Sequence, residues 1–323
     1  MLSSIALPLI VLCTGSDASQ VGDVEGVEAT PPAPEGARFR LRPLLLAVPN
    51  PHANPRDRPG TWNGQSGQDR TVHALMPSDG MGNRHRFFID LAANEWRRNS
   101  NTRALERDYN WEGLCIEANP SLHASLLSQR NCTVVGAAVA STEEMVRFTP
   151  RGVYGGIVGK GMRNSKAHDE DVIEMRTVPF WRILEQTKAP KTIDYMSLDV
   201  EARAPPPPDR TLRSRILALT LSLCQFQGAE SLVMSSFPWD AYSISVLTVE
   251  NPKEDLVQAL EAHGYVWQCN HGHYGDEMWL SRRALEFKHV QRALARGIHN
   301  CTHDPNNGKR VQRKCDCVPP PEP

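Results

Sequence analysis

The sequence lacks several features that would each assign it to a broad class of protein. No apolar run approaches the ~20 residues that a membrane-spanning helix needs, so no firm membrane span is predicted. The 36 Lys and Arg are matched by 37 Asp and Glu, which argues against a nucleic-acid partner because such a partner calls for a basic excess. No G-x-G-x-x-G follows the first predicted strand and no G-x-x-x-x-G-K-S/T occurs anywhere. Nicotinamide and nucleoside-triphosphate chemistry are therefore disfavoured.

The two ends of the chain also lack a sustained apolar period. Residues 1–19 form a candidate signal peptide with an apolar centre, although no Lys or Arg precedes it. Residues 20–83 are rich in Pro, Gly, Asp, Arg and Asn and are predicted to be a disordered lead-in, and residues 291–323 a C-terminal tail. A secretory location, in the ER or Golgi lumen or outside the cell, follows if the first segment is a signal. A cytoplasmic location follows if it is not.

Eight cysteines are present, of which Cys13 falls in the candidate signal and Cys224 in a suspect insert. An even number remains, which would suit disulfides in an oxidising compartment. Cys115 and Cys132 lie in strand-like runs, and we interpret them first as small buried hydrophobic residues. The spacing of the later cysteines and His303 fits no usual zinc pattern, so no metal site is predicted.

Residues 84–290 alternate short apolar runs with helical patterns. Strands are predicted at 86–93, 113–118, 132–139, 193–200, 244–250, 265–269 and 277–281, and helices at 99–109, 119–127, 178–187 and 252–263. Asn119 is the expected N-cap of the second helix, with Pro120 at its first position. This alternation predicts an α/β fold with a Rossmann-like, doubly wound, mainly parallel sheet in a single domain.

In such a sheet, ligands bind outside the carboxyl ends of the strands, where the strand order reverses. Asp90 lies at the end of the first predicted strand and Glu117 at the end of the second. An acid at the second position can accept hydrogen bonds from both hydroxyls of a ribose, although it can equally cap the next helix. The third strand ends in small apolar residues, including Ala138 and Val139, that suit an adenine face. These positions together favour an adenosine ligand without a pyrophosphate.

Several stretches of this region resemble the FkbM-type methyltransferase family. They are Phe88–Asn94, Ser100–Glu106, Trp111–Pro120, Val153–Ile157, Ile193–Glu201 and Gly228–Glu230. The resemblance covers about Arg84 to Arg283. It implies a Rossmann-like sheet of the class I methyltransferase type and S-adenosyl-L-methionine as the cofactor. The implied reaction is O-methylation of a hydroxyl on a small molecule or a glycan.

The resemblance also implies roles for individual residues. Asp199 and Glu201 would face the transfer site. Methyl transfer to a hydroxyl needs a base, which by its chemistry could be Asp199 or Glu201, and His271 and His273 could reach the site from a late loop. Glu117 would hold the ribose, and the stretch from Asp90 to Asn94 would line the methionine side. The full predicted set of cofactor-binding residues is Asp90, Ala92, Ala93, Asn94, Glu117, Ala118, Asn119, Ala138 and Val139.

The chain departs from the family pattern in two places. Ala92 and Trp96 stand at two positions where the family has glycine, which lets backbone approach the cofactor. Residues 202–227 separate Glu201 from Gly228, which are adjacent in the family pattern; we interpret them as a retained intron or as a genuine lid loop. The alternative function is a weak or inactive module of this fold that acts with a protein partner in secretory trafficking, as implied by the resemblance to Star-like relatives.

Overall fold

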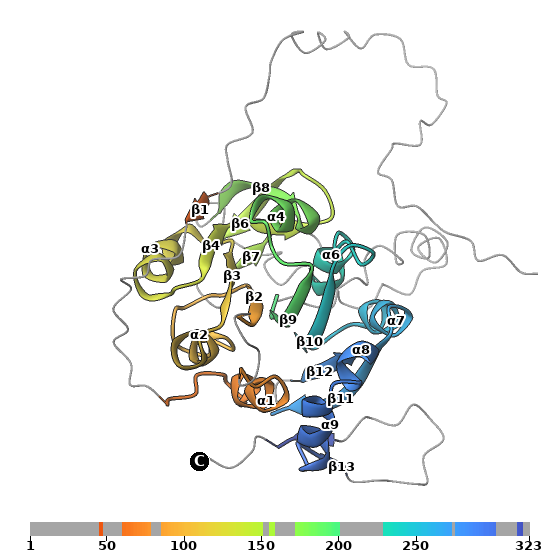
Figure 1. Cartoon of the computed structure of the whole chain (residues 1–323). Coiled ribbons are helices and arrows are strands. Elements are labelled where there is room, and N and C mark those ends of the chain that lie inside the picture. The colour runs from red at the N-terminus through yellow and green to blue at the C-terminus, as the bar shows by residue number, and fades with distance from the viewer. Residues whose placement is uncertain are drawn as a thin grey trace, which may run out of the picture. The chain divides into compact units, whose positions relative to one another are not determined.

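The computed structural model describes residues 45–47, 60–78, 85–150, 155–158, 172–200, 229–272, 275–301 and 315–318 (Figure 1). The candidate signal peptide and the suspect insert at residues 202–227 lie outside the described residues. None of the described helices is both long and apolar enough to cross a membrane.

One large sheet organises the described part of the chain. Its strands run in the order β1-β4-β3-β2-β9-β10-β12-β11-β14-β13. They are β1 (Leu45–Ala47), β4 (Thr133–Gly136), β3 (Glu112–Glu117), β2 (Phe87–Leu91), β9 (Thr192–Leu198), β10 (Ser243–Glu250), β12 (Asp276–Ser281), β11 (Tyr265–His271), β14 (Cys315–Cys317) and β13 (His299–Cys301). The five strands from β4 to β10 are mutually parallel, whereas β12 is antiparallel to both of its neighbours. The prediction of an α/β fold with a largely parallel central sheet is confirmed.

Helices cover both faces of this sheet (Figure 1). The described helices are α1 (Gln68–Leu75), α2 (Arg103–Tyr109), α3 (Pro120–Gln129), α4 (Phe180–Gln186), α6 (Ala229–Met234), α7 (Glu254–Ala262), α8 (Arg282–Leu285) and α9 (Lys288–Ala295). Successive strand residues point to opposite faces, so Phe88 and Tyr195 pack with apolar residues of α1, α2, α3 and α9. Ile89 and Met196 pack with those of α4, α6 and α7. The continuous apolar strands predicted from the sequence are those of a sheet buried on both sides.

Two predicted helix ends, the start of α3 and the end of α7, are confirmed, and one, the start of α2, is wrong. The side chain of Asn119 accepts a hydrogen bond from the backbone N–H of Ser121 at 3.1 Å, which confirms it as the N-cap of α3. Gly264, with φ of 80°, follows the end of α7 as expected. However, α2 begins at Arg103 and not at Asn99, because Asn99 has a left-handed backbone with φ of 59°.

The predicted third strand, residues 132–139, is in fact two strands. β4 ends at Gly136, and the chain then enters β5 (Ala138–Ala140). β5 belongs to a separate four-stranded sheet in the order β5-β8-β6-β7, with β8 (Ile173–Pro179), β6 (Met145–Thr149) and β7 (Gly156–Ile157). A continuous run of apolar residues does not show where a chain passes from one sheet to another.

The two flanking regions contain more structure than their composition predicts. Within the predicted lead-in, α1 is an amphipathic helix, and Val72 and Leu75 on it have no exposed surface. Beyond residue 290, β13 and β14 extend the large sheet, so the predicted tail is partly ordered. Short elements of three to eight residues leave little periodic signal, and tertiary contacts stabilise them.

Two disulfides join residues that are distant along the chain. Cys115 of β3 pairs with Cys132, with their Cα atoms 5.9 Å apart, and Cys269 of β11 pairs with Cys317 of β14, at 5.1 Å. The interpretation of Cys115 and Cys132 as simple buried hydrophobic residues is therefore wrong in part: both side chains are buried, but they are bonded to one another. The second disulfide holds the C-terminal strand against the edge of the sheet.

Candidate functional site

The strand order reverses between β2 and β9. From β2 the chain proceeds outward to β3 and β4, and it then returns to β9 on the other side of β2. Such a reversal leaves a crevice outside the carboxyl ends of the two central strands, because the connections leave them in opposite directions. The residues that end β2, β3 and β9 therefore belong to the candidate site, as the sequence predicts.

The turn that follows β2 has an unusual backbone. Ala92 and Asn94 have φ of 62° and 52°, in the left-handed region that an L-residue enters at a cost. The turn is fixed by the N–H of Ala93, which donates to the carbonyl of Ile116 at 3.1 Å, and by the N–H of Asn94, which donates to Oε2 of Glu117 at 2.7 Å. Ala92 thus occupies the backbone conformation for which the family pattern has glycine.

Replacing Ala92 by glycine is expected to stabilise the protein by about 0.5–1 kcal/mol. The substitution removes the cost of about 1–2 kcal/mol that a residue with a Cβ atom incurs in the left-handed region. Glycine also makes the unfolded chain more flexible, which offsets part of this gain. Chemical denaturation of both proteins measures the difference. The control is Ala259→Gly in the middle of α7, where the same change should destabilise by about 1 kcal/mol. Equal destabilisation by both changes would show that Ala92 is not strained.

Glu117 joins the turn after β2 to the start of α3. Its carboxylate is 6% exposed, and its Oε1 accepts from the N–H of Asn119 at 2.7 Å while Oε2 accepts from Asn94. Burial raises the pKa of Glu117, and the two backbone N–H groups oppose that shift by stabilising the charged form. Each carboxylate oxygen has a second lone pair, so the side chain can also accept hydrogen bonds from a ligand with two adjacent hydroxyls.

Of the other predicted cofactor-binding residues, two follow Glu117 directly and two lie in the second sheet. Ala118 separates Glu117 from Asn119, whose side chain caps α3 and whose backbone N–H holds Glu117. Ala138 and Val139 lie on β5, paired with β8, and are 4% and 8% exposed. Ala138 and Val139 therefore begin a second sheet and do not end the third strand of the first.

Asp90 faces a buried charged cluster and not the open edge of the sheet. It is 4% exposed, and its Oδ2 accepts from the hydroxyl of Thr102 at 2.5 Å and lies 3.7 Å from a guanidinium nitrogen of Arg130. Burial raises the pKa of Asp90, while Arg130 and Thr102 oppose the shift. Its carboxylate thereby links the end of β2 to Thr102, the N-cap of α2.

Arg130 is the centre of this cluster. It has 1% of its surface exposed, and its Nε lies 3.1 Å from Oε2 of Glu106 while its terminal nitrogens donate to the hydroxyls of Ser100 and Thr102 at 3.2 and 2.7 Å. Glu106 also accepts from Arg103 at 2.9 Å. The sequence gives no signal that Arg130 pairs with Glu106, because arginine and glutamate are ordinarily solvent-exposed.

A group of acids lies at the ends of β9 and β10. Asp199 follows β9 and shares a hydrogen bond with Glu250 at the end of β10, and Glu250 pairs in register with Asp276 of β12. Asp199 keeps solvent-exposed surface, but neighbouring protein atoms partly desolvate its carboxyl group. This desolvation raises the pKa of Asp199 well above its usual range, and the hydrogen bond and charge of Glu250 raise it further.

The pKa values of Asp276 and of His271, its partner in register on β11, are also shifted. Burial and the charge of Glu250 raise the pKa of Asp276 to about 6, although the amide of Gln68 donates to it at 2.5 Å. His271 has no exposed surface, and burial lowers its pKa to about 4. Of the predicted catalytic residues, only Asp199 can be placed, because Glu201 and His273 lie outside the described residues.

Glu230 at the start of α6 should make stability depend on pH. Burial and the charge of Glu250 raise its pKa from 4.5 to about 8. The folded protein thus holds this proton more tightly than the unfolded chain does. The contribution of Glu230 to stability is complete below pH 4.5 and is lost as the pH rises through about 8.

Replacing Glu230 by glutamine, which resembles the protonated acid, should therefore stabilise the protein on the order of 2 kcal/mol at pH 8 and leave it unchanged at pH 4. Denaturation curves at the two pH values measure this difference. Glu261→Gln, an exposed acid on α7, is the control and should show no such pH dependence. An equal effect of Glu230→Gln at both pH values would contradict the expectation.

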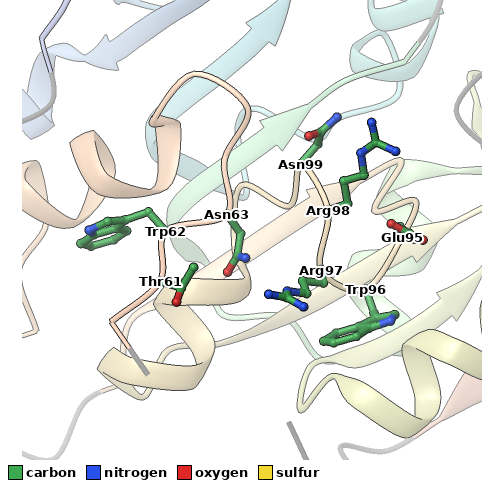
Figure 2. A pocket seen from close by; sticks show the side chains of 8 residues that line it. All are labelled: Thr61, Trp62, Asn63, Glu95, Trp96, Arg97, Arg98 and Asn99. Atoms are coloured by element: carbon green, nitrogen blue, oxygen red, sulfur yellow. The ribbon is translucent and has the colours of Figure 1, made fainter. Parts of the chain in front are cut away.

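A cavity of about 570 Å³ opens beside the turn after β2 (Figure 2). Two segments line it, one preceding α1 and one following the turn. The lining residues are Thr61, Trp62, Asn63, Glu95, Trp96, Arg97, Arg98 and Asn99. The guanidinium group of Arg97 points across the cavity toward the segment that carries Thr61 and Asn63 (Figure 2). Sequence reasoning identified only Trp96 of this set, as the second residue at a glycine position.

Comparisons of the chain with protein-family models, with curated proteins and with solved structures find no match.

Proposed function

We propose that this protein is an S-adenosyl-L-methionine-dependent methyltransferase that methylates a hydroxyl group on a small molecule or a glycan. The observation that carries the proposal is the hydrogen bond between Glu117, at the end of β3, and the turn that follows β2. Glu117 is held by the backbone of the turn after β2, at the place where the strand order reverses. The left-handed backbone at Ala92, where the FkbM-type pattern has glycine, supports the same assignment.

The strand order supports a Rossmann-like type of sheet. Numbered along the chain, the parallel strands β2, β3, β4, β9 and β10 lie in the order 3-2-1-4-5, which is the order at the centre of the doubly wound nucleotide-binding fold. In this arrangement Glu117 ends the second strand, the position whose acid binds ribose hydroxyls. The residues present therefore fit an adenosine-containing cofactor.

Bound S-adenosyl-L-methionine would supply a methyl group on a positively charged sulfur. The ribose would be held by Glu117, and the turn from Ala92 to Asn94 would lie against the cofactor with its backbone. Asp199, at the end of the strand next to β2, would accept the proton of the acceptor hydroxyl. In its ionised form, a carboxyl with a raised pKa is a stronger base than an ordinary aspartate, which suits this role.

The disulfides support a location in the secretory pathway. Cys115–Cys132 and Cys269–Cys317 join buried residues that are distant along the chain, and such bonds persist mainly in oxidising compartments. The candidate signal peptide at residues 1–19 points to the same location. An acceptor in that compartment would be a glycan or a small molecule.

The alternative proposal is a weak or inactive module of the same fold in secretory trafficking. One observation favours it: Trp96 stands at the second glycine position and lines the cavity beside the turn, where a glycine would leave more room. Binding of the cofactor discriminates between the two functions.

The test is calorimetric titration of the full chain with S-adenosyl-L-methionine and with S-adenosylhomocysteine, with NAD as the control ligand. We expect both sulfur compounds to bind and NAD not to bind, since no dinucleotide loop follows β2. The absence of binding by either sulfur compound at millimolar concentration would exclude the methyltransferase and leave the trafficking module.

A further inference from the structure

The cavity beside the turn has a positively charged rim. Arg97 and Arg98 are exposed, and neither guanidinium group contacts a carboxylate among the residues that the structure describes. Glu95 is the one acid among the lining residues, so the cavity keeps an excess of one positive charge. A guanidinium group without an acidic partner can bind a carboxylate or sulfate through two parallel hydrogen bonds.

Two of the lining residues are aromatic, and each has a neighbour that holds its ring, although the ring of Trp62 points away from the other lining side chains (Figure 2). The ring of Trp62 stacks on Tyr109 with centroids 5.6 Å apart, and the guanidinium of Arg103 lies 5.7 Å from the ring centre of Trp96. Arg103 is itself fixed by Glu106 in the buried cluster. The ring of Trp96, held by Arg103, therefore offers a flat apolar surface without a large loss of side-chain entropy on binding.

The size and the remaining polar groups define the ligand further. A volume of about 570 Å³ lies in the range of small-molecule sites, which is about 300–1,000 Å³. The amides of Asn63 and Asn99 line the same cavity and can donate to and accept from hydroxyl groups. Aromatic faces, amides and guanidinium groups together match a hydroxylated ring that carries an acidic group.

We propose that this cavity binds the carboxylate or sulfate group of the methyl acceptor, an acidic saccharide. The proposal rests on the proposed function, because the segment Glu95–Asn99 directly follows the turn that would lie against the cofactor. The arginines would hold the acidic group, and the hydroxyl to be methylated would lie on the same ring compound.

The experiment titrates glucuronate, glucose 6-sulfate and uncharged glucose into the full chain and follows tryptophan fluorescence, since Trp62 and Trp96 line the cavity. We expect both acidic sugars to bind and glucose to bind at least tenfold more weakly. The double variant Arg97→Ala/Arg98→Ala should lose at least tenfold in affinity for the acidic sugars. The matched control Arg283→Ala, an exposed arginine on α8, should keep the affinity of the parent. Circular dichroism confirms that the variants are folded.

Equal affinity of the double variant and the parent for the acidic sugars would overturn the proposal. S-adenosyl-L-methionine is titrated into the same preparations. If the double variant weakens only this ligand, the arginines bind the cofactor's own carboxylate, which also overturns an acceptor site. If the acidic sugars bind as expected while the cofactor binds to neither protein, the proposed function fails alone and the anion site stands.

Discussion

Replacing Arg130 by alanine is expected to lower the free energy of unfolding by about 3–5 kcal/mol. Arg130 is buried and lies between two acids, Glu106 at 3.1 Å and Asp90 at 3.7 Å. Removing it leaves the buried Asp90 without this cation and leaves Glu106 with Arg103 alone. These carboxylates must then be protonated or draw in water, and both adjustments cost free energy.

Chemical denaturation of the variant measures this loss. The control is Arg292→Ala on the exposed side of α9, which should change stability by about 0.5 kcal/mol or less. The double variant Arg130→Met/Glu106→Gln should be destabilised by less than the sum of its single changes, because it removes both charges of the pair. A single-variant loss below about 1 kcal/mol would contradict the assignment of Arg130 as the centre of the cluster.

Replacing Glu117 by alanine is expected to weaken binding of S-adenosyl-L-methionine by about 2–4 kcal/mol, or thirtyfold to a thousandfold. The change removes two charge-assisted hydrogen bonds to the ribose. It also releases the N–H groups of Asn94 and Asn119, which Glu117 now holds at 2.7 Å each. The turn after β2 would then lose one of the contacts that fix its left-handed backbone.

Calorimetry of the parent and the variant measures the effect on binding, and thermal unfolding shows whether the fold survives. Glu117→Gln keeps one acceptor oxygen and should lose less affinity than Glu117→Ala. Glu112→Ala is the matched control, since this exposed acid begins the same strand at the opposite edge of the sheet. Unchanged affinity in a folded Glu117→Ala protein would exclude a ribose role for this residue.

The sequence by itself determined the parallel centre of the fold and the position of the candidate site within it. Each of these features depends on residues that are close along the chain. Asn119 and Pro120 start α3 through local hydrogen bonding and backbone geometry. Asp90 and Glu117 are placed at strand ends because the apolar runs before them end there. The sequence drew attention to Ala92 only because it stands where the family pattern has glycine, and the structure shows that its backbone is left-handed.

The tertiary structure decided which distant residues meet. Arg130 lies 24 residues from Glu106 along the chain, and nothing in the local sequence distinguishes it from a solvent-exposed arginine. Cys115 reaches Cys132 only because β3 and β4 are neighbours. Glu250 and Asp276 lie near Asp199 only because β9 and β10 end, and β12 begins, at one edge of the sheet. Burial and pKa depend on the summed packing of such remote segments, and so they could not be derived from local pattern alone.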